Sequence, residues 1–225
     1  WVEGALAEAN ALRGDTALLT DLYDRPEWLS GLLEQLTEVE IEFARAQIEA
    51  GADIIGLGDA IASTISPKMY RQFALPYEQR IFAAVREMGA IPRLHICGNT
   101  SKIVPDMARS GAQIIDLDWM VDFAKVAQLL IPLPPGGERN RFAFAKRGEG
   151  QYSQTNAPLS LCGNFDPVQI MLRGAPEDAY QATLACLTAG GPTCLSAAGC
   201  EIPIDTPPEN IHAQNRALKD FVGQV

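Results

Sequence analysis

Long amphipathic segments alternate with short apolar runs along this chain. The phrase GADIIGL at residues 51–57 returns sixty positions later as GAQIIDL at 111–117. In each phrase a glycine that can end a helix in the left-handed conformation precedes a short β-rich run. Three similar runs lie at 91–97, 158–162 and 193–197. The pattern predicts a buried strand at each of these places, with the end of a further strand at 1–6.

Helix start signals lie between the predicted strands. Ser66 and Pro67 predict an N-cap followed by proline in the first turn, and Pro76 predicts a kink or a break in the helix that follows. Further helices are predicted to begin at Pro26, Pro176 and Pro208. Because helices separate successive strands, the strands must pair in parallel, and parallel sheets are covered on both faces. The sequence therefore predicts the α/β class.

Two architectures produce this alternation, a closed (β/α)8 TIM barrel and an open doubly wound sheet. No Gly-x-Gly-x-x-Gly turn follows a predicted strand and no phosphate-binding loop occurs, which weakens the nucleotide-binding open sheet. We therefore expect a TIM barrel. A complete barrel needs about two to three more β/α units than are visible here. Residues 1–225 are thus interpreted as a single domain, the C-terminal two thirds of a barrel whose N-terminal strands precede Trp1.

One segment, residues 132–156, breaks the alternation. It contains the run PPGG and two clusters of charged residues, with few signals for helix or strand. Loops of this length are uncommon inside compact domains and are either functional or mobile. We interpret the segment as a flexible insertion between a helix and the next strand.

Composition narrows the function classes. The chain has 47% hydrophobic and 20% charged residues, as globular domains do, and a net charge of −10. Without a basic cluster, nucleic acid and anionic membranes are poor partners. The longest apolar stretch, near 126–133, is far shorter than the roughly 20 residues of a membrane span. Neither the opening WVEGA nor the five cysteines suggests secretion, so a cytoplasmic protein with free thiols is expected.

Polar side chains follow the predicted strands, at the end where parallel barrels bind their ligands. His95 and Cys97 are two residues apart on one strand, so their side chains leave the same face. Cys200, after the last strand, is the natural third ligand. One histidine and two cysteines suit zinc with one coordination position open, which is typical of catalytic sites. The competing interpretation makes all three residues ordinary packing residues.

Carboxylates and amides follow the same strands. Asp59, Asp116 and Asp118 are candidates for general acids or bases, of which Asp59 and Asp118 are preferred. An aspartate at a strand end equally often caps the following loop or helix, so both interpretations stay open. The candidates for substrate binding are Asn99, Trp119, Asn164 and Asp166.

The sequence resembles the uroporphyrinogen decarboxylase superfamily and, within it, the corrinoid-linked methyltransferase branch. The resemblance rests on phrases that occur in the order of the family: WVEG at 1–4, LYD at 22–24, ISPKMY at 65–70, LHICGNT at 94–100, IDLDW at 115–119, CGNFDP at 162–167, and AGCEIP at 198–203 with DTP at 205–207. It implies a (β/α)8 barrel. It also implies that His95, Cys97 and Cys200 match the zinc ligands of methylcobamide:coenzyme M methyltransferases and their relatives.

The function that this resemblance implies is zinc-dependent transfer of a methyl group. The donor would be a methyl-corrinoid on a separate carrier protein, and the acceptor a thiol or a similar small molecule. A cofactor-free uroporphyrinogen decarboxylase is the first alternative, although its carboxylated substrate calls for arginines and the predicted strands offer only Arg93. A non-catalytic corrinoid-binding scaffold is the second. A chain that begins inside a barrel exposes a strand edge, which favours a homo-oligomer.

Overall fold

The computed structural model describes residues 1–131, 159–191 and 193–223. The chain divides into two compact units, Trp1–Ile115 and Asp116–Val225, and each is described by itself. The expectation that the chain is a single domain therefore stays a prediction. The insertion predicted at 132–156 lies outside the described residues.

The first unit is built around short parallel strands. These are β1 (Val2–Glu3), β2 (Ile54–Gly58), β3 (Ile91–Ile96) and the start of β4 (Ile114–Leu117). In their register Glu3 is opposite Gly58, and Gly58 is opposite His95. Gln113 donates a backbone hydrogen bond of 2.8 Å to Pro92, which brings the start of β4 alongside β3. The strands predicted for this half of the chain are all present and parallel.

The two faces of these strands differ in polarity. Leu57, Leu94 and Ile96 are fully buried and lie on the face that packs against helices. Since successive side chains of a strand point to opposite faces, the residues between them lie on the other face. We call this second face the inner face; its residues are Trp1, Glu3, Gly56, Gly58, Arg93, His95 and Cys97. The apolar core and the polar candidates for chemistry are thus separated across one sheet.

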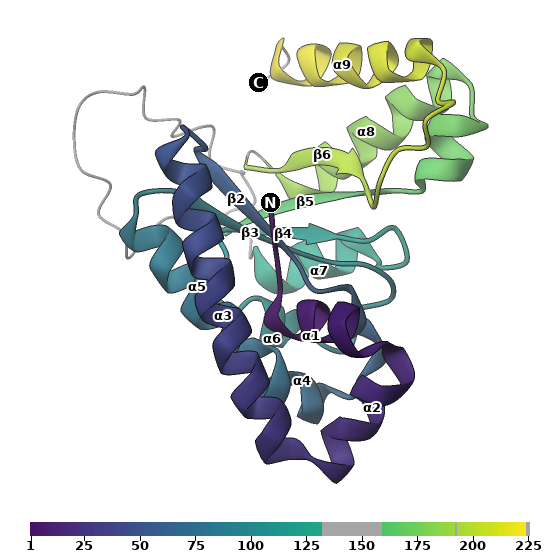
Figure 1. Ribbon diagram of the computed structural model, residues 1–225. Helices are drawn as coiled ribbons and strands as arrows, with labels where there is room; N and C mark the ends of the chain where they lie inside the picture. Colours follow the sequence, from purple (N-terminus) through teal and green to yellow (C-terminus); the bar gives the residue numbers. More distant parts are fainter. Residues whose placement is uncertain (132–158, 192, 224–225) are drawn as a thin grey trace. The chain divides into compact units, whose positions relative to one another are not determined.

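Helices follow each strand of the first unit. They are α1 (Ala5–Arg13), α2 (Asp15–Asp24), α3 (Pro26–Glu49), η1 (Ala60–Thr64), α4 (Pro67–Phe73), α5 (Leu75–Glu87) and α6 (Val104–Met107). Ser66 caps α4 by accepting a hydrogen bond of 3.3 Å from the backbone N–H of Met69. The predicted break at Pro76 separates α4 from α5, and α3 runs alongside α5 (Figure 1). The separation of α1 from α2 at Gly14, where φ is +78°, was not predicted.

The second unit contains β5 (Ser160–Phe165) and β6 (Leu195–Ala198), which pair in parallel. Its helices are α7 (Phe123–Leu130), the π-helical turn η2 (Pro167–Leu172), α8 (Pro176–Gly190) and α9 (Pro208–Gly223), and α8 packs along α9 (Figure 1). The strand predicted to end at Cys162 continues to Phe165, so Asn164 lies inside β5 rather than beyond it. Gly163 caused this error, because a glycine after an apolar run is a usual signal for a strand end.

The α/β class predicted from the sequence is confirmed by these parallel strands and the helices between them. The helix starts at Pro26, Pro176 and Pro208 are also confirmed. No helix within the described ranges is both long enough and apolar enough to cross a membrane.

Candidate metal centre

His95 and Cys97 form the centre of the candidate site in the first unit. His95 is the next-to-last residue of β3, at the carboxyl end of the strand, and Cys97 directly follows the strand. The His95 Nε2 atom lies 3.2 Å from the Cys97 Sγ atom, and both residues are half-buried. Asp59 donates a backbone hydrogen bond of 3.1 Å to the His95 carbonyl oxygen, which fixes this end of β3 against β2.

The separation of the two atoms fits zinc. A tetrahedral zinc ion bound at about 2.0 Å by an imidazole nitrogen and at about 2.3 Å by a thiolate holds these two atoms about 3.5 Å apart. The observed 3.2 Å is close to that value, and the Cys97 thiol is not in a disulfide. The pair can therefore supply two ligands to one ion without a rearrangement of β3.

Trp1 lies beside the pair on the inner face. Its ring centroid is 6.5 Å from that of His95, and the Arg93 guanidinium lies 5.7 Å from the Trp1 centroid. The ring lies over Gly56, where an added Cβ atom would come within 2.1 Å of it. Only glycine at this position leaves room for the indole, so β2 is shaped to hold Trp1 next to His95.

Glu3 is a candidate that sequence analysis missed. Its carboxylate lies on the inner face, with Oε2 3.3 Å from the position that a Cβ atom on Gly58 would occupy. Partial burial raises its pKa, and the negative charge of Glu8 adds to this effect. A signal was available, because Trp1 and Glu3 share the parity of one strand face within the phrase WVEG.

Asp59 lies on the other side of β2. Its side chain is fully buried beside Glu78 of α5, and Tyr70 of α4 donates a hydrogen bond of 2.6 Å to Glu78 Oε2. Burial raises the pKa of Asp59 to about 7, with a further contribution from the charge of Glu3. Burial and the charge of Asp59 also raise the pKa of Glu78. The carboxyl groups of Asp59 and Glu78 thus form a buried acid pair on the side of β2 opposite the inner face.

Asp118 and Asn164 are tied to one turn of the second unit. The Asp118 carboxylate accepts a hydrogen bond of 2.9 Å from the backbone N–H of Met120. The Asn164 amide donates to the carbonyl oxygens of Asp118 and Val121, at 3.0 and 2.7 Å. Both side chains are buried, and Trp119 between them is 42% exposed. The capping interpretation of Asp118 thus has a visible basis, while its catalytic role stays a prediction.

The remaining predicted residues lie at the ends of their elements. Asp166 caps η2 by accepting hydrogen bonds of 2.7 and 2.9 Å from the backbone N–H groups of Val168 and Gln169. Asn99 is exposed and accepts one hydrogen bond of 3.2 Å from the Ser101 N–H. Cys200 follows β6 in the second unit; it is half-buried and its thiol is not in a disulfide.

Replacing Asn164 by Ala is expected to lower the free energy of unfolding by about 2 to 3 kcal/mol, because two buried carbonyl oxygens lose their donor. The measurement is the urea midpoint followed by circular dichroism. Asn99→Ala is the control, since it removes an exposed amide and should change stability by about 0.5 kcal/mol or less. Equal losses in the two variants would contradict the structural role of Asn164.

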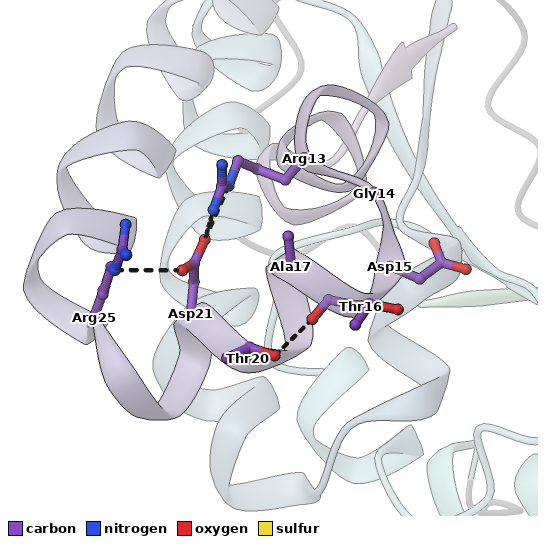
Figure 2. Close-up of a pocket in the computed structure, with 8 residues that line it drawn as sticks. All are labelled: Arg13, Gly14, Asp15, Thr16, Ala17, Thr20, Asp21 and Arg25. Atoms are coloured by element: carbon purple, nitrogen blue, oxygen red, sulfur yellow. Dashed lines mark hydrogen bonds and ion pairs between the residues drawn. The ribbon is translucent and has the colours of Figure 1, made fainter.

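A separate open pocket of about 760 Å³ lies on the first unit, where α1, α2 and α3 meet (Figure 2). Its charges pair with one another: Asp21 accepts from Arg13 at 2.7 Å and lies 3.9 Å from Arg25. The Arg13 guanidinium also lies 5.1 Å from the centroid of the Trp28 ring. Because these cations already have partners, the pocket receives no functional assignment.

Comparison with known proteins supplies the context. The family model of uroporphyrinogen decarboxylase matches residues 4–221. The methylcobamide:CoM methyltransferase MtbA of Methanosarcina mazei is 30% identical over 220 residues, covering 97% of this chain and 56% of that protein. The uroporphyrinogen decarboxylase of Nocardia farcinica is 35% identical over 111 residues, covering 49% of this chain and 31% of that protein.

A solved structure shows the same fold. It is described as a methyltransferase from Methanosarcina mazei and aligns with a TM-score of 0.78 and 25% sequence identity. The alignment covers 98% of this chain and 57% of the solved one. The chain thus spans a little over half the length of MtbA and of this structure.

Proposed function

The chain belongs to the uroporphyrinogen decarboxylase family, and from this premise we propose that it is a zinc-dependent methyltransferase acting between a methyl-corrinoid protein and a thiol or similar acceptor. Its fold is that of a partial (β/α)8 barrel, as the sequence predicts. Relatives with methyl-transfer names support the proposal; one, the methylated-thiol–coenzyme M methyltransferase of Methanosarcina mazei, is 27% identical over 197 residues. The observation that carries it is the 3.2 Å separation of His95 Nε2 and Cys97 Sγ.

His95, Cys97 and Cys200 are the proposed zinc ligands. One imidazole and two thiolates leave the fourth tetrahedral position to the acceptor. When bound, zinc supplies the Lewis acidity that keeps the acceptor thiol in its thiolate form at neutral pH. The chain's own contribution is position: β3 presents His95 and Cys97, and the backbone N–H of Asp59 holds the end of that strand through the His95 carbonyl oxygen.

The reaction balances without a further reagent. The thiol proton would leave to solvent when the acceptor binds, and the sulfur would then form the bond to the methyl carbon. The cobalt–carbon bond of the donor would break, and its electron pair would remain with the donor. The partner protein that carries this corrinoid would dock where the strands end, because ligands of such barrels enter there.

The predicted substrate residues divide into two groups by their surroundings. Asn99 and Trp119 have exposed side chains, so we assign them to contact with the acceptor or the carrier protein. Asn164 and Asp166 hold backbone N–H or carbonyl groups of their own unit, so we assign them to positioning. Asp59 and Asp118 keep their proposed role as general acids or bases. This role is tested by the assay of methyl transfer from methylcobalamin to a thiol.

The test is metal content of the purified chain by mass spectrometry. About one zinc per chain is expected in the unaltered protein and none in Cys97→Ser/Cys200→Ser. The variant should also lose methyl transfer from methylcobalamin to a thiol by about 100-fold or more, since even outer-shell partners of a metal contribute up to that much. Cys194→Ser is the control, because Cys194 is half-buried beside the Cys186 carbonyl oxygen and is not a proposed ligand.

Zinc-free protein with a folded circular dichroism spectrum would refute the proposal. Decarboxylation of a tetrapyrrole by that protein would then establish the first alternative, which the Nocardia relative favours. Absence of both activities would leave the corrinoid-binding scaffold.

A further inference from the structure

Glu3, Gly58 and His95 form one row across the inner face of the first unit. Glu3 pairs with Gly58, and Gly58 pairs with His95. Neighbouring strands lie about 4.8 Å apart, so the backbones at Glu3 and His95 are separated by about 10 Å. Gly58 lies between them and has no side chain of its own, and the edge of the Trp1 indole covers it. An acceptor bound beside His95 therefore meets the Trp1 indole and the Glu3 carboxylate along the same row.

Two polar groups converge over Gly58. The Trp1 Nε1 atom and the Glu3 Oε2 atom lie 3.0 and 3.3 Å from the position that a Cβ atom on Gly58 would occupy. The indole N–H donates hydrogen bonds only, and the carboxylate accepts them. Glu3 is an exposed residue, so its carboxylate is accessible from the inner face. The site next to His95 thus contains a built acceptor of hydrogen bonds.

Three of the charged groups at Glu3 are carboxylates, its own included. Glu8 of α1 acts on Glu3 as a second negative charge. Glu40 of α3 accepts a hydrogen bond of 3.2 Å from the Glu3 backbone N–H, which places a third carboxylate behind the strand. Two cations lie near the same row: the amino group of Trp1, which Gln47 holds, and the Arg93 guanidinium, 5.7 Å from the Trp1 ring centroid. Glu3 itself would repel an anionic acceptor and attract a cationic one.

Given the proposed function, we infer that Glu3 is a specificity-determining residue that selects acceptors with an ammonium or another N–H donor close to the methyl-accepting atom. Acceptors with a sulfonate or a carboxylate at that place are disfavoured. The chemical class expected for the acceptor is thus an aminothiol or a similar donor-bearing molecule. The inference concerns the acceptor only and leaves the carrier protein unchanged.

The experiment compares three thiols that share a two-carbon chain and differ in charge: 2-aminoethanethiol, 2-mercaptoethanol and 2-mercaptoethanesulfonate. The full chain is loaded with Co²⁺ in place of zinc, and binding is measured from the thiolate-to-cobalt absorption band, without methyl transfer. Dissociation constants are expected to rise in the order given, by about 10-fold from first to last, for one partly screened charge contact. The ratio of kcat/KM with methylcobalamin should follow the same order.

Glu3→Gln should bring the three dissociation constants to within about twofold of one another, since the shape is kept and the charge is lost. Glu8→Gln is the matched control; it removes the same charge from α1, which is not one of the strands that form the inner face, and should keep most of the order. Gly58→Ala is a second variant, because its methyl group would displace Glu3 and Trp1 without a change of charge, and it should also weaken the selection.

The outcomes separate this inference from the proposed function. Equal affinities in the unaltered protein, or an order that survives Glu3→Gln, would overturn the inference and leave methyl transfer intact. If metal-loaded protein binds none of the three thiols, the thiol acceptor of the proposed function fails, and the inference fails with it. A spectrum unchanged from that of the unaltered protein in far-ultraviolet circular dichroism establishes that each variant is folded.

Discussion

Replacing Asp59 by Asn is expected to reduce the decline in unfolding free energy as the pH rises from about 4 to about 8, and Glu78 is expected to cause the decline that remains. The reason is the buried acid pair. Asp59 has no exposed surface, Glu78 is 1% exposed, and both have raised pKa values, that of Asp59 being about 7. Burial is the main cause in both, because a charged carboxylate loses its hydration in the interior.

The direction follows from proton binding. The folded-state pKa of Asp59 lies above its ordinary value of 3.8, so in this range the folded state keeps a proton that the unfolded state releases. The stabilisation is therefore complete below pH 3.8 and is lost as the pH rises through about 7. The shift of Asp59 by itself corresponds to a loss of about 4 kcal/mol over that range, and the raised pKa of Glu78 adds to the loss.

The measurement is urea unfolding at pH 5 and at pH 8, followed by circular dichroism. Asp59→Asn should show a smaller difference between the two conditions than the unaltered protein. Asp122→Asn is the control, because Asp122 is exposed and its contact with Lys125 lowers its pKa. A pH dependence in Asp59→Asn equal to that of the unaltered protein would show that Asp59 is ionised in the folded state at pH 5.

A second large effect is expected from Gly199→Ala, which should lower the free energy of unfolding by about 3 kcal/mol or more. A Cβ atom on Gly199 would lie 2.2 Å from the Trp119 backbone nitrogen and 2.8 Å from its Cα atom. Backbone atoms cannot move aside by a change of rotamer. The Gly199 N–H also donates a hydrogen bond of 2.8 Å to the Phe165 carbonyl oxygen, so the segment after β6 is held at this distance.

Gly31→Ala provides the matched comparison. Gly31 is an exposed residue of α3, and a Cβ atom there meets nothing within 4 Å. The same glycine-to-alanine change should therefore stabilise the protein by about 0.5 to 1 kcal/mol, since alanine favours the helix. Thermal unfolding of both variants tests the pair; a loss of stability in Gly31→Ala, or none in Gly199→Ala, would contradict the packing described here.

Local signals predicted much of the fold. The Ser66 cap, the break at Pro76 and the spacing of His95 and Cys97 each depend on residues within a few positions of one another. Backbone sterics and side-chain alternation decide such features, so sequence is sufficient. The strand that ends at Phe165 was harder, because a glycine inside a strand looks like the end of one.

Features that depend on distant pairing could not be predicted. Glu3 reaches the row of His95 only through the register of β1, β2 and β3, which residues ninety positions apart establish together. Glu78 offered a clearer signal. It lies in the apolar stripe of α5 with Leu75, Ile81 and Val85, all buried, and an acid at such a position needs a partner or a proton.

The alternation of faces along β3 has a consequence for how such a protein changes over generations. Leu94 and Ile96 have no exposed surface, while His95 and Cys97 between and beyond them are half-buried on the inner face. A substitution of His95 or Cys97 alters what the molecule reacts with, whereas a substitution of Leu94 or Ile96 alters whether it folds. Selection for a new substrate and selection for a stable chain therefore act on different residues of the same strand and can proceed independently.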